Sequence, residues 1–280
     1  MRAAVVGHME WMGFLRVEHV PAAGEIVHAT EWWEAPGGAA AGAAVQMLKL
    51  AGAATLFTAV GDDEVGGWAC RELADLGLRV EAAERERPTR RGIAHVDSSG
   101  ERTITVVGER HAPLGRDNLP WHELDSADVV YFTAGDVAAL KLARRARVLV
   151  ATSRVLPLLK ESGVELDALV GSASDPAESY RSGDLDPPPR VVVRTGGSES
   201  GTFVVGGERT RSFAAAPLPG PIVDTYGAGD SFAGGLSFGL GAGWDVEKAV
   251  GLAARCGAAV LTGRGSYEGQ LSGPPVGPTP

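Results

Sequence analysis

The sequence predicts an α/β fold: a three-layer α/β/α sandwich whose mainly parallel central sheet is covered by helices on both faces. The first observation is the regular alternation of short apolar runs with helical patterns from about residue 127 onward, which is typical of strand–helix–strand units. The second is that these runs are continuous, as in strands that are buried on both faces. The third is a pair of segments with alternating polar and apolar residues, which predicts a small second sheet with one solvated face.

The elements of the first half follow from periodicity and turn residues. Residues 3–6 are predicted to form a buried first strand, and residues 10–35 mix tryptophans with polar residues, which indicates irregular strands with one exposed face. A Pro-Gly-Gly turn then opens an alanine-rich helix over residues 39–50. The remaining expected elements are a strand at 53–60, a helix at 65–76, a strand starting at Val80 before a charged stretch over 81–91, and a hairpin of 92–96 and 103–107 around Ser98–Gly100.

The second half alternates strands and helices. Ligands of such sheets bind at the carboxyl ends of the strands, where the connecting loops meet. The tail over residues 272–280 is rich in proline and glycine and is expected to be disordered. The expected strands are 129–132, 148–151, 166–170, 191–193 and 202–205, and the expected helices are 137–145 and 155–160.

Composition excludes several classes of protein. The length of 280 residues, with 44% hydrophobic and 22% charged residues, suits one large α/β domain with an insertion or two modest domains. A net charge of -9 argues against nucleic acid as a partner. The N-terminus lacks the pattern of a signal peptide, and no uncharged apolar stretch is long enough to span a bilayer. Two cysteines, Cys70 and Cys256, lie far apart, which fits a cytoplasmic protein.

The stretch from Asp224 to Gly235, which contains Gly227-Ala228-Gly229-Asp230, carries the strongest chemical signal. Phe232, Leu236 and Leu240 follow at helical spacing, so the small residues are expected at a helix N-terminus. There the first backbone N–H groups have no intrahelical partner and the helix dipole favours negative charge. The turn is therefore a candidate phosphate cradle, with Asp230 placed to take a proton from an attacking hydroxyl.

Two other interpretations apply to the same turn. Asp230 could be an ordinary N-cap, since aspartate is among the preferred capping residues. A dinucleotide-binding fingerprint fits less well, because a third glycine is missing at the required spacing and the turn is far from the first strand. The residues of this stretch alone do not decide between the cap and the phosphate cradle.

The rest of the chain limits the choice of phosphate chemistry. No Gly-x-x-x-x-Gly-Lys-Ser/Thr sequence is present, which excludes a P-loop nucleotide-binding protein. The six histidines have no metal-ligand spacing, and no Gly-x-Ser-x-Gly elbow supports a hydrolase. A glycine pair, Gly37-Gly38, precedes the alanine-rich helix and is a second place where a ligand could approach the backbone closely.

These motifs together resemble the PfkB, or ribokinase-like, carbohydrate kinases. Asp224-Thr225-x-Gly227-Ala228-Gly229-Asp230 is similar to the C-terminal signature of that family, and Gly37-Gly38 before an alanine-rich helix is similar to its N-terminal signature. Gly61-Asp62-x-x-x-Gly66 and Thr195-x-Gly197 follow in the family's order. The resemblance extends to about Gly265.

The resemblance implies a fold and partners. It implies one ribokinase-like α/β domain over residues 1–265, with the strands of a β-sheet lid inserted at about 10–35 and 88–110. It also implies ATP as the phosphate donor and Mg²⁺ as the metal. Members often dimerise through the lid, so a homodimer is a hypothesis.

The resemblance also implies roles for individual residues. Asp230 would be the catalytic base, and the backbone N–H groups of Gly227, Ala228 and Gly229 would form the anion hole. Thr195 and Gly197 would border the nucleotide phosphates and ribose, and the segment that starts at Cys256 and Gly257 would lie beside adenine. Asp224 and Tyr226 match positions near the monovalent-cation site of some members, although Tyr226 replaces a more usual threonine.

Three positions depart from the family pattern. The acidic residue that holds sugar hydroxyls could only be Glu10, and the asparagine expected after Gly37 and Gly38 is Gly42. The Asn-x-x-Glu motif that organises Mg²⁺ should fall near residues 171–175, where Asp175 is the carboxylate at hand. The departures concern the acceptor and metal sites and not the base or the anion hole. They therefore indicate an unusual acceptor more than the loss of catalytic activity.

The sequence therefore predicts an ATP-dependent kinase that phosphorylates a hydroxyl of a sugar or sugar-like small molecule. A nucleoside acceptor is an alternative, because Trp11, Trp32 and Trp33 could stack on a base. A catalytically weak descendant that binds a nucleotide or metabolite as a regulator is the other alternative, and the altered Asn-x-x-Glu region favours it.

Overall fold

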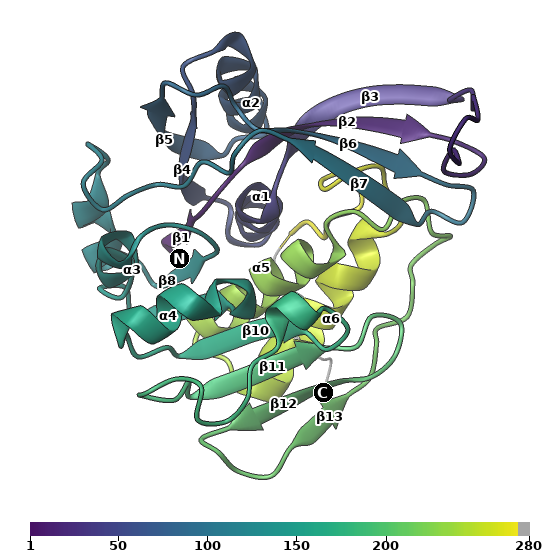
Figure 1. Cartoon of the computed structure of the whole chain (residues 1–280). Helices are drawn as coiled ribbons and strands as arrows, with labels where there is room; N and C mark the ends of the chain where they lie inside the picture. Colours follow the sequence, from purple (N-terminus) through teal and green to yellow (C-terminus); the bar gives the residue numbers. More distant parts are fainter. Residues whose placement is uncertain (274–280) are drawn as a thin grey trace.

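The computed structural model of the chain describes residues 1–273 and contains the predicted three layers (Figure 1). Seven neighbouring strands of the main sheet run parallel, and the last two pairs at one edge are antiparallel. Val5 in the middle of the sheet lies opposite Leu56 on one neighbour and Tyr131 on the other. From edge to edge the order is β13 (Arg211–Phe213), β12 (Gly201–Val205), β11 (Val191–Thr195), β10 (Ala168–Ser172), β9 (Val148–Thr152), β8 (Val129–Phe132), β1 (Ala3–Val6), β4 (Ala54–Gly61) and β5 (Arg79–Arg85).

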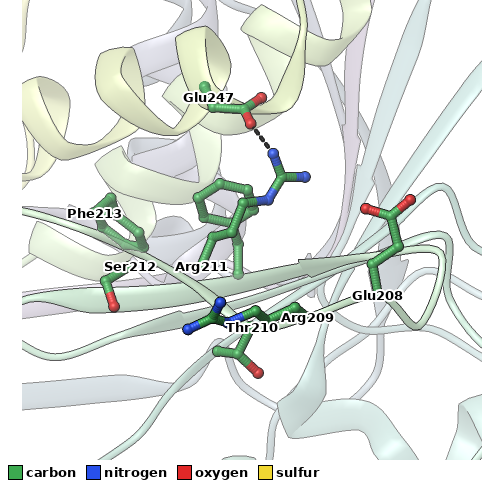
Figure 2. Close-up of a pocket in the computed structure, with 8 residues that line it drawn as sticks. Glu208, Arg209, Thr210, Arg211, Ser212, Phe213 and Glu247 are labelled. Atoms are coloured by element: carbon green, nitrogen blue, oxygen red, sulfur yellow. Dashed lines mark hydrogen bonds and ion pairs between the residues drawn. The ribbon is translucent and has the colours of Figure 1, made fainter.

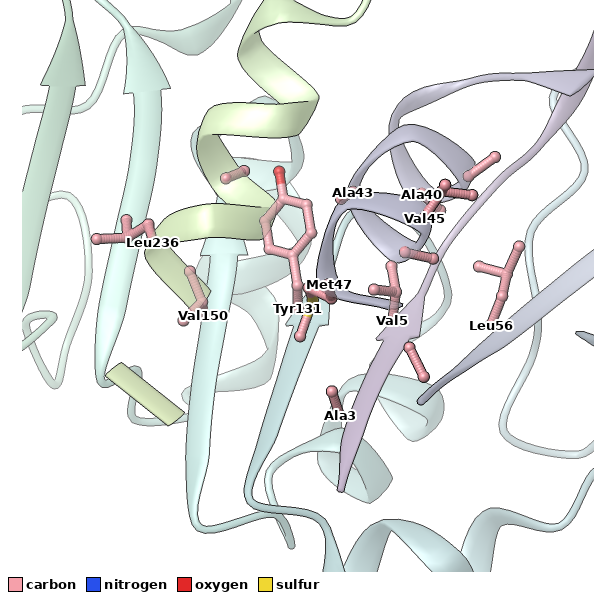
Figure 3. Close-up of a cluster of buried hydrophobic side chains, with 14 of the residues drawn as sticks. Ala3, Val5, Ala40, Ala43, Val45, Met47, Leu56, Tyr131, Val150 and Leu236 are labelled. Carbon is pink, nitrogen blue, oxygen red and sulfur yellow. The ribbon is translucent and has the colours of Figure 1, made fainter. Parts of the chain in front are cut away.

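Each face of the sheet has its own hydrophobic core, because successive side chains of a strand point to opposite faces. Ala3 and Val5 belong to one cluster, and Ala4 and Val6 belong to the other. The first cluster, part of which is shown in Figure 3, packs against α1 (Ala39–Ala51), α2 (Glu64–Asp75), α5 (Ala228–Gly241) and α6 (Val246–Val260). The second packs against α3 (Val137–Ala143), α4 (Leu156–Ser162) and the 3₁₀ turn Trp121–Ser126.

A separate four-stranded sheet projects from one end of the sandwich (Figure 1). We call it the lid, and its order is β3 (Glu31–Gly37), β2 (Glu10–Arg16), β6 (Arg91–Val96) and β7 (Arg102–Val107). Met12, Phe14, Ala94 and Val96 on its inner face are buried against Tyr226. β6 and β7 come from the two segments whose alternating pattern predicted a half-solvated sheet, and β2 and most of β3 come from residues 10–35, which were expected to form irregular strands with one exposed face.

The predicted elements differ from the structure in three places. The charged stretch over residues 81–91 is partly strand, since β5 continues to Arg85. β5 is an edge strand, so its charged side chains stay partly solvated and pair with charges on neighbouring elements. The short β13 and the first ten residues of α6 have no counterpart among the elements expected from periodicity.

The three tryptophans do not share one surface. Trp33 stacks on Phe14 of the inner face, with ring centroids 5.0 Å apart. Trp32 covers Gly13 and remains 54% exposed, while Trp11 packs on Trp68 of α2 with centroids 6.1 Å apart. The alternation of side chains along β3 separates the adjacent Trp32 and Trp33, so the expectation of one base-stacking cluster is wrong.

Two further expectations concern the ends of the chain and the membrane. Most of the tail predicted to be disordered, residues 274–280, lies outside the described residues. Within residues 1–273, none of the helices has both the length and the apolar character that crossing a bilayer requires.

Replacing Leu56 by alanine should destabilise the fold by roughly 2–5 kcal/mol, since a fully buried leucine leaves a cavity between β4 and the helices. The free energy of unfolding from urea denaturation measures the effect. Leu76→Ala is the matched control, because Leu76 is 46% exposed and its truncation should cost less than about 0.5 kcal/mol. Equal losses for both variants would contradict the core assignment.

Candidate active site

The N-terminus of α5 presents free backbone N–H groups at the carboxyl ends of the parallel strands. Gly227 caps the helix with φ of 81°, a left-handed conformation that suits glycine. Asp230 lies in the first turn, and its side chain makes no capping hydrogen bond. The interpretation of Asp230 as an N-cap is therefore wrong, because Gly227 occupies that position. The turn keeps the N–H groups that the phosphate interpretation requires.

The carboxyl of Asp230 lies in an environment that favours its protonated form. Although the residue keeps some solvent contact, burial raises the pKa of this carboxyl to about 6. Among the neighbouring charges, Arg102 and Arg154 lower the pKa, whereas Glu178 and Glu10 raise it. A carboxylate with a pKa near neutrality is suited to exchange a proton with a hydroxyl.

The loop before α5 is held by Asp224 and Tyr226. Asp224 is fully buried, and its two carboxylate oxygens accept hydrogen bonds from the backbone N–H groups of Tyr226 (2.8 Å) and Gly265 (2.9 Å). Burial raises the pKa of Asp224, although these hydrogen bonds oppose the shift. The Tyr226 hydroxyl accepts from the Gly38 backbone N–H at 3.1 Å. These bonds connect the start of α5 to the glycine pair and to the C-terminal loop, and the monovalent cation stays a prediction.

The glycine pair and Gly42 surround the other side of Asp230. Gly37 ends β3 so close to the loop that an added Cβ would lie 2.6 Å from the Tyr226 hydroxyl oxygen. On α1, a Cβ at Gly42 would lie 3.0 Å from the Asp230 Cβ atom and 3.4 Å from its Oδ2 atom. The absence of a side chain at Gly42 therefore leaves space directly beside the candidate base.

Glu10 lies at the start of β2, opposite Gly37 in the lid. Its carboxylate forms an ion pair with Arg90, with 3.0 Å between Oε2 and Nε. Glu10 is 7% exposed, so burial raises its pKa while Arg90 and Arg110 lower it. Glu10 therefore begins the first lid strand and lies beside the glycine pair, and its charge is balanced by an arginine that sequence reasoning did not consider. Its role in holding an acceptor stays a prediction.

The expected nucleotide-binding residues fall at the ends of their elements. Thr195 ends β11, and Gly197 follows with φ of 64° and no atom within 4 Å of an added Cβ. On α6, a Cβ at Gly257 would lie 3.3 Å from the carbonyl oxygen of Ala228, so Gly257 borders the start of α5. The side chain of Cys256 is fully buried in a core cluster, so its thiol contacts the interior and not a surface where a nucleotide could lie.

Asp175 belongs to a small ionic cluster with two residues that the sequence analysis missed. Arg154 donates to Asp175 Oδ2 at 2.5 Å and to Glu178 Oε1 at 2.6 Å. Glu178 also accepts from the backbone N–H of Ser172 at the end of β10. The signal was present, because Asp175-Pro176-Ala177-Glu178 keeps the spacing of Asn-x-x-Glu with aspartate in place of asparagine.

The donor set at this cluster suits Mg²⁺ that is bound through water. Mg²⁺ keeps several waters and uses one or two carboxylates together with substrate phosphates, and Asp175 and Glu178 provide two carboxylates. Within residues 1–273, no group of three or more histidine, cysteine or acidic side chains is arranged to hold a metal ion directly. Direct coordination by a protein cage therefore does not fit.

The lid contacts the loop before α5 through its arginines. Arg102 of β7 donates to the Thr225 hydroxyl at 3.0 Å, and Arg16 of β2 donates to the Val223 carbonyl at 3.3 Å. The Thr225 backbone N–H also donates to the carbonyl of Gly100 in the hairpin turn. These bonds close the lid over the entrance to α5, and they place Arg102 close enough to lower the pKa of Asp230.

A surface pocket of about 740 Å³ lies elsewhere, beside the hairpin that joins β12 and β13 (Figure 2). Its lining includes Arg209 and an ion pair between Arg211 and Glu247. Glu247 is in the first turn of α6, ten residues before Gly257, which corresponds to about 15 Å along a helix. Because neither Asp230 nor the first turn of α5 lines the pocket, we do not assign the phosphate chemistry to it.

Comparison with known proteins defines the class. The match to the pfkB family carbohydrate kinase model covers residues 2–158 and 157–272. The chain is 28% identical to an ATP-dependent ribose-1-phosphate kinase from Halopiger xanaduensis over 98% of this chain and 95% of that protein. Its fold is similar to a putative ribokinase from Agrobacterium tumefaciens (TM-score 0.80, 21% identity, 97% and 94% of the two chains covered). It is also similar to Arabidopsis thaliana ribokinase complexed with ribose and ATP (TM-score 0.75, 20% identity, 96% and 95% covered).

The fold and the matched family together identify a phosphotransferase. A parallel α/β sandwich with a β-sheet lid is the architecture shared with the ribokinase structures. The chain belongs to the pfkB family of carbohydrate kinases.

Gly42→Ala should lower phosphoryl transfer without lowering stability. Alanine is favoured over glycine inside a helix by about 1 kcal/mol, but its Cβ would press on Asp230. Turnover should fall roughly tenfold or more, because misplacement by about 1 Å costs about 100-fold. Gly251→Ala on α6 is the control, since an added Cβ there has no atom within 4 Å. Unchanged kinetics in Gly42→Ala would show that this contact does not position Asp230.

Proposed function

We propose that the protein transfers the γ-phosphoryl group of ATP to a hydroxyl group of a sugar or sugar-like small molecule. The observation that carries this proposal is the position of Asp230 in the first turn of α5, with a raised pKa and next to free backbone N–H groups. A base beside an anion-binding helix terminus is the arrangement that phosphoryl transfer to a hydroxyl requires.

In the proposed reaction, Asp230 accepts the proton of the acceptor hydroxyl. The hydroxyl oxygen forms a bond to the γ-phosphorus, and the bond to the bridging oxygen of ADP breaks. The negative charge on the transferring group is stabilised by the backbone N–H groups of Gly227, Ala228 and Gly229 at the helix N-terminus. Mg²⁺, when bound, would neutralise charge on the nucleotide phosphates, and Asp175 and Glu178 would hold its waters.

The nucleotide is proposed to lie along the carboxyl ends of β10 and β11. Thr195 ends β11, and the space around Gly197 is open, so a nucleotide could approach the backbone of this loop. Gly257 has no side chain and lies next to the Ala228 carbonyl at the start of α5. The Arabidopsis thaliana ribokinase structure that shares this fold is described as complexed with ribose and ATP. By similarity, ATP is the phosphate donor proposed for this chain.

Ribose derivatives are the acceptors that the similar proteins suggest. The Halopiger xanaduensis relative is named for ribose 1-phosphate, and the Bacillus subtilis relative, 25% identical, is a ribokinase. A nucleoside acceptor lacks the support of a shared tryptophan surface, because Trp32 and Trp33 lie on opposite faces of the lid. A catalytically weak protein that binds a nucleotide or metabolite as a regulator remains the second candidate. Arg154 forms ion pairs with Asp175 and Glu178, the two carboxylates that would organise Mg²⁺, and these pairs compete with the metal.

A homodimer through the lid stays a prediction. The lid exposes Trp32, Ile93 and Val107, which are residue types found at subunit contacts.

Replacing Asp230 with asparagine should lower kcat/KM by roughly 10²–10⁴-fold, because asparagine cannot take the hydroxyl proton. ADP release across a panel of sugars, sugar phosphates and nucleosides measures the effect, with the exposed Asp75→Asn as the matched control. If wild type turns over no acceptor but still binds ATP, the kinase proposal fails and the regulator is favoured. An Asp230→Asn variant as active as wild type would show that the assigned base is wrong.

The pH dependence of turnover should report the pKa of Asp230. The base must be unprotonated, and kcat/KM reports the pKa values of the free enzyme, so kcat/KM should fall as the pH drops through about 6 and stay level above it. Arg102→Met should move this midpoint upward, because Arg102 is the foremost charge that lowers the pKa of Asp230. An acid limb centred near pH 4 in wild type, the range of an ordinary aspartate, would contradict the assigned environment.

A further inference from the structure

The chain that follows α6, residues 263–273, runs past several parts of the candidate site, and we call it the strap. The backbone N–H of Gly265 donates to Asp224 Oδ2 in the loop before α5 at 2.9 Å. The hydroxyl of Tyr267 donates at 2.7 Å to the carbonyl of Pro36, the residue before the glycine pair. The strap therefore links the loop before α5 to the end of β3.

Gln270 of the strap joins α1 to the first turn of α5. Its Nε2 atom donates to the Gly42 carbonyl of α1 at 2.8 Å and to the Ser231 hydroxyl oxygen at 3.0 Å. A carbonyl oxygen only accepts, so the amide of Gln270 must present its NH₂ group to it. Gln270 is 5% exposed and Ser231 is fully buried, so bulk water does not compete for either bond.

Both partners of Gln270 adjoin the candidate base. Ser231 is the residue after Asp230 at the start of α5. Gly42 approaches Asp230 from α1, where an added Cβ would lie 3.0 Å from the Asp230 Cβ atom. The separation of the two helices beside Asp230 therefore depends on one buried amide, and removing such a group leaves its partners unsatisfied.

The strap also contacts Gly227, the cap of α5. An added Cβ at Gly227 would lie 3.2 Å from both the Cα and the Oγ atoms of Ser266, which is 2% exposed. The start of α5 is thus held at its cap by Ser266 and within its first turn by Gln270. Such restraint matters for chemistry, because a misplacement of about 1 Å can cost about 100-fold in rate.

We propose that Gln270 is a positioning residue for phosphoryl transfer, which holds Asp230 in place and keeps water away from its carboxyl group. Gln270 acts through Ser231 and Gly42, and it has no chemical step of its own. Loss of the amide would free the first turn of α5 to move away from α1 and would admit water beside the carboxyl. The inference rests on the proposed function, because Asp230 is taken as the base that accepts the hydroxyl proton.

Gln46 provides a matched control between the same two elements. It lies one helical turn after Gly42, about 6 Å further along α1, and is fully buried. Its Nε2 atom donates to the Leu271 carbonyl of the strap at 3.0 Å. Within residues 1–273, the Oε1 atoms of both glutamines lack a hydrogen-bond partner. Gln46 therefore shares the burial and the bonding of Gln270 without a hydrogen bond to the residue beside Asp230.

Gln270→Met should lower kcat roughly tenfold or more, while the KM values for acceptor and ATP change less than about threefold. The acid limb of kcat/KM should move from about pH 6 toward about pH 4, because water beside Asp230 removes part of the burial that raises its pKa. Gln46→Met should lose similar stability in urea denaturation but keep its acid limb and keep kcat within about twofold of wild type. ADP release measures the kinetics of all variants.

Two further variants keep the test decisive if Gln270→Met is poorly folded. Gln270→Glu keeps the shape of the side chain, but an ionised carboxylate cannot donate to the Gly42 carbonyl. Well above the acid limb, its kcat should therefore fall as in Gln270→Met. Ser231→Ala removes one partner of the amide and should lower kcat roughly two- to tenfold. Added to Gln270→Glu it should cost less than it does alone, because the two residues act through one contact.

The outcomes separate this inference from the proposed function. If Gln270→Met and Gln46→Met change kcat and the acid limb alike, or if Ser231→Ala is as active as wild type, Gln270 has only a structural role and the kinase proposal stands. If wild type turns over no acceptor, the proposed function fails. An NMR titration of the Asp230 carboxyl carbon, assigned by its absence in Asp230→Asn, then still decides whether Gln270 positions Asp230. A midpoint lowered in Gln270→Met alone supports this role, and an unchanged midpoint overturns it.

Discussion

The close packing of α5 between α1 and α6 is the constraint on which the site depends. Added Cβ atoms at Gly234 and Gly235 would lie 2.8 Å from the Ala43 carbonyl oxygen of α1 and 2.7 Å from the Cys256 Sγ atom of α6. Only glycine allows helices to approach this closely. Because α5 is held on two sides, its first turn has a fixed position at the carboxyl ends of the parallel strands. Asp230 and the free backbone N–H groups are fixed in position with this turn.

Burial of the Asp230 carboxyl also raises its pKa. The environment that raises the pKa of Asp230 contains two arginines and two glutamates from separate elements: Arg102 and Glu10 from the lid, and Arg154 and Glu178 from the loops after β9 and β10. Opposite effects of these charges leave desolvation as the dominant cause. The proton affinity of the candidate base is therefore a property of the closed lid as well as of α5, since Arg102 reaches it from β7.

The candidate site matches the family pattern at the start of α5, where the phosphoryl group is proposed to bind, and departs from it on the proposed acceptor side. The turn at Gly227–Asp230 resembles the family signature, and Asp224 holds the loop before it through two hydrogen bonds from backbone N–H groups. On the acceptor side, Gly42 replaces an asparagine and Glu10 is neutralised by Arg90. The departures from the family pattern therefore lie beside Asp230 and at the start of the lid, and not in the first turn of α5.

The sequence by itself determined the class of fold, the helix start at Gly227 and the half-solvated lid, because these depend on periodicity and local turn chemistry. It also contains the Asp175-x-x-Glu178 spacing. Only the tertiary structure decided which distant charges meet: Arg90 with Glu10 across the lid, Arg154 with Glu178 between two loops, and Arg102 with Thr225. It likewise separated Trp32 from Trp33 and buried Cys256. Such pairings depend on strand register and helix packing, which join residues far apart in the chain and leave no local pattern to predict them from.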